Sequence, residues 1–186
     1  MMAEARLRGF LAGLSVVALV SVAAVGCGPK APEGPPIGMS DKPGLSAPMD
    51  RPLTYEFDSL DDRVVSSGAM VGKPTVIVFI QTGDLDGQAQ VDYLVAMAKN
   101  DHDKVNYVLV ALHPRKEIVL VEAYAKTLGV EFPVALGDGT VTGAAGPFGP
   151  MPAVPTTVIL ARDGRMVWKH TGIAKSDELR SHMRGL

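Results

Sequence analysis

Two continuous runs of apolar, largely β-branched residues constrain the fold of this chain more than any other feature. They span residues 75–81 and 105–112, and the first follows the turn-forming sequence Gly72-Lys73-Pro74. Such runs are typical of strands that are buried on both faces. The residues between them predict an amphipathic helix over about 86–99, because apolar side chains recur there at helical spacing, at Val91, Leu94, Val95 and Ala98.

The second half of the chain continues this alternation of helix and strand. A helix is predicted over 117–128, ending at Gly129, since glycine is favoured just beyond the end of a helix. Residues 156–161 and 165–169 flank a turn with the sequence Arg-Asp-Gly, and together they predict a β-hairpin.

A last helix is predicted over about 177–183, with Ser176 as its N-cap. Strand–helix–strand units imply parallel pairing, whereas the closing hairpin implies an antiparallel edge. The sequence therefore predicts an α/β domain with a mixed central sheet flanked by helices.

Composition excludes several classes of function. The 186 residues have a formal net charge of −2, so the chain lacks the basic surface that nucleic acids require. Its one cysteine, Cys27, cannot form an intramolecular disulfide or a zinc site made of cysteines alone. We expect no cofactor.

The N-terminus has the layout of a secretory signal peptide over residues 1–26. Arg6 and Arg8 precede an apolar segment, residues 10–25, that ends in small residues. The alternative is a transmembrane anchor, but this segment is shorter than the roughly 20 residues that a spanning helix needs.

The sequence Ala24-Val25-Gly26-Cys27 resembles the lipobox of bacterial lipoproteins. This resemblance implies that Cys27 is lipidated and becomes the mature N-terminus, which would anchor the protein in the membrane of the cell envelope, facing the periplasm. Gly28, which is not acidic, favours the outer membrane by resemblance to enterobacterial lipoproteins.

Residues 27–52 form a separate segment that is rich in proline and glycine and almost free of bulky apolar side chains. Such a composition cannot bury enough surface to offset the entropy of ordering, so we expect a disordered tether. The folded domain is then predicted to span residues 53–186.

Three segments of this domain resemble the TlpA-type thioredoxin-like proteins. Residues 72–79 are similar to the strand that leads into their active site, 153–160 to their cis-proline strand, and 57–64 to their N-terminal β-hairpin. The resemblance implies a thioredoxin-like fold in which the peptide bond between Val154 and Pro155 is cis.

The chain departs from this family at the active site. Where the family carries Cys-x-x-Cys, residues 81–88 read Gln-Thr-Gly-Asp-Leu-Asp-Gly-Gln, which places Asp84 and Gly87 near the two cysteine positions. A carboxylate cannot exchange disulfides or reduce peroxide as a thiolate does. We therefore expect no catalytic residue for disulfide reductase or peroxidase chemistry, although similarity alone would suggest a thiol-disulfide oxidoreductase.

Asp84 and Asp86 have two interpretations. Either they start the helix, because a carboxylate at the N-cap accepts backbone N–H groups and favours the positive end of the helix dipole. Or they converge with His113, which follows the second buried strand, at the carboxyl ends of adjacent strands. One histidine and two carboxylates could hold a divalent metal.

Two further segments lie close to the predicted cis-proline in sequence. Residues 137–146 are rich in glycine and are interpreted as a flexible loop, because they lack a phosphate-binding motif. Residues 146–152, which include Met151, are stiff and apolar; they either pack over the sheet or form an interaction surface. Trp168 is expected in the core.

Together these patterns favour a redox-inactive thioredoxin-like lipoprotein that serves as a protein-binding, peptide-binding or scaffold module at the envelope. Its partners would be the membrane, through the lipid anchor, and an envelope protein or peptide. The alternative is a metal-binding or small-ligand-binding accessory protein that uses Asp84, Asp86 and His113. The predicted binding surface is the former active-site face, with Asp84, Asp86, Gly87, Met151, Val154 and Pro155.

Overall fold

A computed structural model describes residues 50–186 of the chain. The predicted signal peptide, Cys27 and the tether as far as residue 49 lie outside the described residues. Near the start of the described part, Pro52 forms an isolated β-bridge with Arg165. Within residues 50–186, no helix combines the length and the apolar character that crossing a membrane requires.

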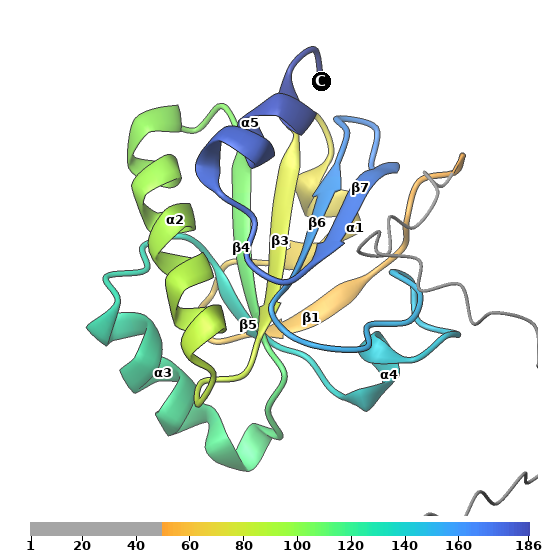
Figure 1. Ribbon diagram of the computed structural model, residues 1–186. Helices are drawn as coiled ribbons and strands as arrows, with labels where there is room; N and C mark the ends of the chain where they lie inside the picture. The colour runs from red at the N-terminus through yellow and green to blue at the C-terminus, as the bar shows by residue number, and fades with distance from the viewer. Residues whose placement is uncertain (1–49) are drawn as a thin grey trace, which may run out of the picture. The chain divides into compact units, whose positions relative to one another are not determined.

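The described domain is built on one mixed sheet of seven strands, in the order β2-β1-β5-β4-β3-β6-β7 (Figure 1). Its centre is parallel, with β3 (Thr75–Ile80), β4 (Asn106–Ala111) and β5 (Val134–Leu136). The strands β3 and β4 were predicted, whereas the short β5 was not. The predicted hairpin forms an antiparallel edge, with β6 (Thr156–Leu160) and β7 (Met166–Thr171).

The N-terminal hairpin forms the other edge of the sheet. Its strands β1 (Glu56–Ser59) and β2 (Val65–Ser66) are antiparallel, as the family resemblance implies. β1 also pairs antiparallel with β5, which joins the hairpin to the main sheet. The sequence pattern did not predict this second pairing, because it joins residues that are far apart in the chain.

Helices cover both faces of the sheet. One face packs against α2 (Leu85–Asp101), α3 (Ile118–Thr127) and α5 (Ser176–Met183). The other packs against α1 (Ser67–Met70), α4 (Gly139–Thr142) and the segment that contains Phe148 and Met151. A single 3₁₀ turn, η1 (Arg115–Glu117), precedes α3.

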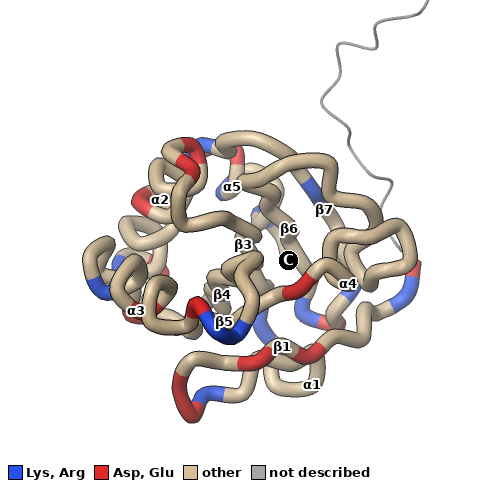
Figure 2. The backbone as a smooth tube through the Cα atoms, turned by 90° about the horizontal axis from the view of Figure 1, so that it is seen from below, with Lys and Arg blue, Asp and Glu red and all other residues tan. Residues whose placement is uncertain are grey.

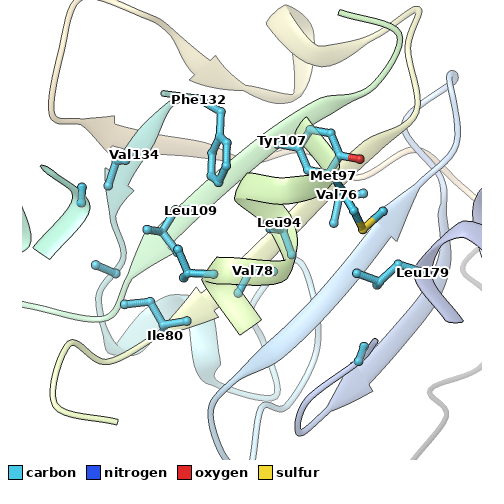
Figure 3. Packing of buried hydrophobic residues seen from close by; sticks show 14 of the residues in the cluster. Val76, Val78, Ile80, Leu94, Met97, Tyr107, Leu109, Phe132, Val134 and Leu179 are labelled. Atoms are coloured by element: carbon cyan, nitrogen blue, oxygen red, sulfur yellow. The ribbon is translucent and has the colours of Figure 1, made fainter. Parts of the chain in front are cut away.

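This two-sided cover explains why the central strands read as continuous apolar runs. All six residues of β3 are buried, and successive side chains enter opposite layers, Val76, Val78 and Ile80 on one face and Ile77 and Phe79 on the other. Figure 3 shows the first layer, in which Leu94 and Met97 of α2 pack with the strand residues and with Leu179 of α5. Trp168 lies in the same layer, as predicted.

Two details of the predicted secondary structure are wrong, one at a helix start and one in a predicted loop. Ser176 is the first residue of α5 rather than its N-cap, because the extended residue before the helix is Lys175, which makes no side-chain capping bond. The glycine-rich segment 137–146 contains α4, because the Asp138 carboxylate accepts the N–H of Thr140 at 2.9 Å and starts a helical turn.

Candidate functional site

The face expected from the sequence begins where β3 ends and α2 starts. Asp84 is the N-cap of α2: its half-buried carboxylate accepts the backbone N–H of Gly87 at 3.0 Å. Asp86 lies exposed in the first helical turn, where the helix dipole favours a negative charge. Both residues therefore start the helix, which was the first of the two interpretations.

Gly87 is buried against the end of β3. A Cβ atom at this position would lie 3.3 Å from Asp84 Oδ2 and 3.4 Å from Ile80 Cβ. The glycine lets the first turn of α2 pack closely on the strand while Asp84 caps it. Gly87 therefore affects the position of the helix start but is itself buried.

The segment before β6 forms the second part of the face. The Val154–Pro155 peptide bond is cis, as the family resemblance implies, and the buried Pro155 accepts the N–H of Gly172 through its carbonyl oxygen at 2.7 Å. Val154 is half-buried, and its backbone N–H and C=O make no hydrogen bond within residues 50–186. These two groups therefore have no partner among the described residues.

The residues after β7 complete the face, and a buried side chain of α2 holds them in place. Gln90 donates from Nε2 to the carbonyl of Ala174 at 3.1 Å and accepts the Ala174 N–H through Oε1 at 2.6 Å. Ile173, between the two anchored residues Gly172 and Ala174, is 38% exposed. Leu85, the first residue of α2, is 79% exposed.

Three apolar side chains thus come from three segments that meet beyond the end of β3. We call Leu85, Val154 and Ile173 the apolar face. The buried hydrogen bonds of Gln90 and Pro155 fix these segments relative to one another. Sequence analysis included Val154 but missed Leu85 and Ile173, whose apolar character alone gives no signal of exposure.

Met151 does not belong to this surface. It is only 9% exposed and packs with Phe148 in the apolar layer on the other side of the sheet. Its N–H donates to the carbonyl of Thr142 at 3.0 Å, which ties the segment to α4. Residues 146–152 therefore pack over the sheet, which was the first of the two interpretations, and Met151 offers little exposed surface to a partner.

The same segment is held by a buried lysine that sequence analysis missed. Lys169 of β7 donates from Nζ to the carbonyl oxygens of Phe148, at 3.0 Å, and Pro150, at 2.5 Å. It makes no ion pair within residues 50–186. Because burial removes water from the ammonium group, the pKa of Lys169 lies below its ordinary value.

His113 lies at the carboxyl end of β4 and contacts the loop after β3 instead of the two aspartates. Its Nε2 accepts the backbone N–H of Thr82 at 3.0 Å and lies 3.1 Å from the Thr82 hydroxyl. Its Nδ1 lies 2.8 Å from Glu117 Oε2. The ring thus joins the β3–α2 loop to η1.

The three residues of the metal alternative do not form a site. Asp84 is turned toward Gly87, Asp86 is exposed, and the two ring nitrogens of His113 already have partners. Among residues 50–186, no group of three histidine, cysteine or carboxylate side chains could hold a metal ion. The predicted convergence of Asp84, Asp86 and His113 is therefore wrong.

Two open cavities flank His113. One, of about 340 Å³, is lined by residues that include Gln81, His113 and Asp138; the other, of about 330 Å³, extends toward β1 and Arg115. Figure 2, which views the domain from below, shows acidic and basic residues side by side near β1. No field of one sign marks this end of the domain for a strongly charged ligand.

The sequence matches no protein-family model and no curated protein. Similarity to solved structures identifies the fold. A DsbF homologue from Corynebacterium diphtheriae is 19% identical over 73% of this chain and 86% of its own, with a TM-score of 0.63. A thioredoxin-family thiol:disulfide interchange protein from Chlorobium tepidum is 17% identical over 77% and 95%, with a TM-score of 0.61.

The exposed lipoprotein thioredoxin of Streptococcus pneumoniae is also similar, at 18% identity over 72% of this chain and 99% of its own, with a TM-score of 0.60. Identities this low establish the fold alone. The described domain is thus a thioredoxin-like domain. It contains no cysteine, since the single cysteine of the chain is Cys27.

Proposed function

We propose that this protein is a redox-inactive, thioredoxin-like lipoprotein of the bacterial cell envelope that binds an extended segment of a partner protein. The observation that carries the proposal is that the backbone of Val154 has no hydrogen-bond partner among the described residues, while Leu85 and Ile173, on segments that hydrogen bonds tie together, are exposed. An extended peptide can pair with such a backbone and place alternate side chains on the apolar surface.

Redox inactivity follows from the residues at the former dithiol positions. Asp84 caps α2 with its carboxylate, and Gly87 is buried beneath it. Neither can form a thiolate, which is the nucleophile in thiol–disulfide exchange. The lone thiol, Cys27, has no second cysteine in the chain with which to form a disulfide.

The envelope location rests on the N-terminal sequence and on the similar structures. One of these is a secreted disulfide oxidoreductase of Mycobacterium tuberculosis, and another is the exposed pneumococcal lipoprotein. The predicted signal peptide and lipobox support the same compartment for this chain, with Cys27 as the anchor. Gly28 favours the outer membrane.

The experiment that tests the binding proposal selects short random peptides, displayed on phage, against the full chain in detergent. The selected peptides are then measured against Leu85→Ser and Val119→Ser variants. Val119 is a matched control, because it is 72% exposed on α3, a helix that contributes no residue to the apolar face. We expect Leu85→Ser to lose the peptides and Val119→Ser to keep them.

Two results would overturn the proposal. Peptides that bind wild type and Leu85→Ser equally well would place recognition elsewhere on the chain. A selection that yields no binding peptide would show that the apolar face does not take an extended segment. The melting temperatures of both variants must match that of wild type, which is expected for exposed positions.

A further inference from the structure

We propose that His113 is a positioning residue of the apolar face: it holds the β3–α2 loop as a neutral imidazole, and its protonation rearranges this loop and weakens peptide binding. The binding half of this inference rests on the proposed function. The loop half stands on the geometry of the described residues and can be tested without a partner.

The hydrogen bonds fix the tautomer of His113. A backbone N–H can only donate, so the 3.0 Å contact from Thr82 N makes Nε2 the acceptor, without a proton. The ring proton is then on Nδ1, which donates to Glu117 Oε2 at 2.8 Å. Both contacts are satisfied when the ring is neutral with its proton on Nδ1, because Nε2 then accepts and Nδ1 then donates.

Protonation of His113 changes Nε2 from a hydrogen-bond acceptor to a donor. In the imidazolium both ring nitrogens donate, so Nε2–H would face the N–H of Thr82 and that bond would be lost. The Thr82 hydroxyl oxygen, 3.1 Å from Nε2, can accept a hydrogen bond from the new N–H group. The charged ring therefore favours a loop in which Nε2 bonds to the hydroxyl and the amide turns away.

The charged groups around His113 come from four parts of the fold. Its side chain is 12% exposed and lines both cavities, so solvent protons can reach it. Glu117 is in direct contact with Nδ1. Arg115 forms an ion pair with Asp58, which offsets its positive charge. The cavity lining and the loop contribute three further acidic residues, Glu56, Asp84 and Asp138.

The loop connects His113 to the apolar face over three residues. The N–H of Asp84 donates to the carbonyl of Gln81 at 3.1 Å, which makes residues 81–84 a compact turn. Asp84 caps α2, and Leu85 follows it directly. A turned Thr82 amide displaces this cap and moves Leu85, which is the most exposed of the three apolar side chains.

The test follows ring and backbone nitrogens by NMR in the full chain, between about pH 8 and pH 5, the range in which histidine titrates. At high pH we expect the His113 proton on Nδ1. As the ring becomes charged, the amide signals of Thr82 and Leu85 should shift together with it. A His113 proton on Nε2 at high pH, or amide signals that stay fixed while the ring titrates, would overturn the inference.

Two variants separate positioning from a general effect of pH. His113→Gln places a non-titrating amide oxygen where Nε2 lies, so the Thr82 signal should lose its pH dependence while the fold is kept. His102→Asn is the control, since His102 is exposed with a left-handed φ of 40° that asparagine tolerates. It should behave as wild type. A pH dependence that survives in His113→Gln would contradict the inference.

The affinity of the peptides from the phage selection is the second readout. Their affinity for wild type should fall about fivefold or more between the two ends of this pH range, and it should stay constant for His113→Gln. A constant affinity for wild type would show that the loop change does not reach the face. If the selection yields no peptide, the proposed function fails, and the NMR measurement alone decides whether His113 controls the loop.

Discussion

Asp84 caps α2 at a position where the resemblance to TlpA-type proteins would place a cysteine. Its carboxylate satisfies the N–H of Gly87, one of the backbone donors that the start of α2 leaves free. We expect Asp84→Ala to lower the free energy of unfolding by about 1 kcal/mol, whereas Asp86→Ala should cost only about 0.3 kcal/mol, through the helix dipole. Denaturant unfolding measures both, and equal losses would contradict the capping role.

Lys169 gives a prediction at alkaline pH. Its pKa is lower in the folded protein than the ordinary lysine value of 10.5, because burial disfavours the charged amine. Between these two values the unfolded chain binds more protons, so the contribution of Lys169 to stability rises with pH through this window. The free energy of unfolding of wild type should therefore rise relative to that of Lys169→Met as the pH approaches 10.5. A constant difference would contradict the lowered pKa.

At the scale of elements, close backbone packing holds α4 and the segment that follows it. A Cβ at Gly146 would lie 2.6 Å from the carbonyl oxygen of Val141 and 2.7 Å from that of Thr140, and these backbone atoms cannot move aside freely. Gly146→Ala should therefore cost about 1–3 kcal/mol in unfolding free energy. Gly143→Ala is the matched control, because its Cβ would have only contacts of 3.8 Å. Similar melting temperatures for both variants would contradict this packing.

The elements that could be predicted from the sequence are those whose signals are local. β3 and β4 are recognisable because both of their faces are buried, and α2 because a capping aspartate precedes an apolar stripe. α4 was missed because a short turn within a glycine-rich segment has no periodicity. The position of His113 beside the end of β3 was predicted, but its partner Thr82 was missed, because the direction of a side chain at a strand end depends on the folded loop.

The candidate site could be predicted from the sequence only in part. Asp84 and Val154 could be located from the sequence, because they occupy fixed places beside the central strand and the proline. The surface itself could not, since exposure depends on how segments pack. Met151 and Leu85 are both apolar, yet one is buried against the sheet and the other is 79% exposed.

For the whole molecule, we expect a thioredoxin-like fold that lacks disulfide reductase activity. The full chain should not accelerate the reduction of insulin disulfides by dithiothreitol. Asp84→Cys/Gly87→Cys should gain measurable activity, because a dithiol at the start of α2 would have its thiolate stabilised by the helix. Activity of the unmodified chain, at the level of the double variant, would show that another group performs the reaction.

The most direct test of the central claim is photocrosslinking in living bacteria, with a benzophenone amino acid placed at position 85 or at position 119. We expect a specific crosslinked protein from position 85, competed by a selected peptide, and none of the same product from position 119. An identical pattern from both positions, or no product from position 85, would contradict the claim that the former active-site face is a recognition surface.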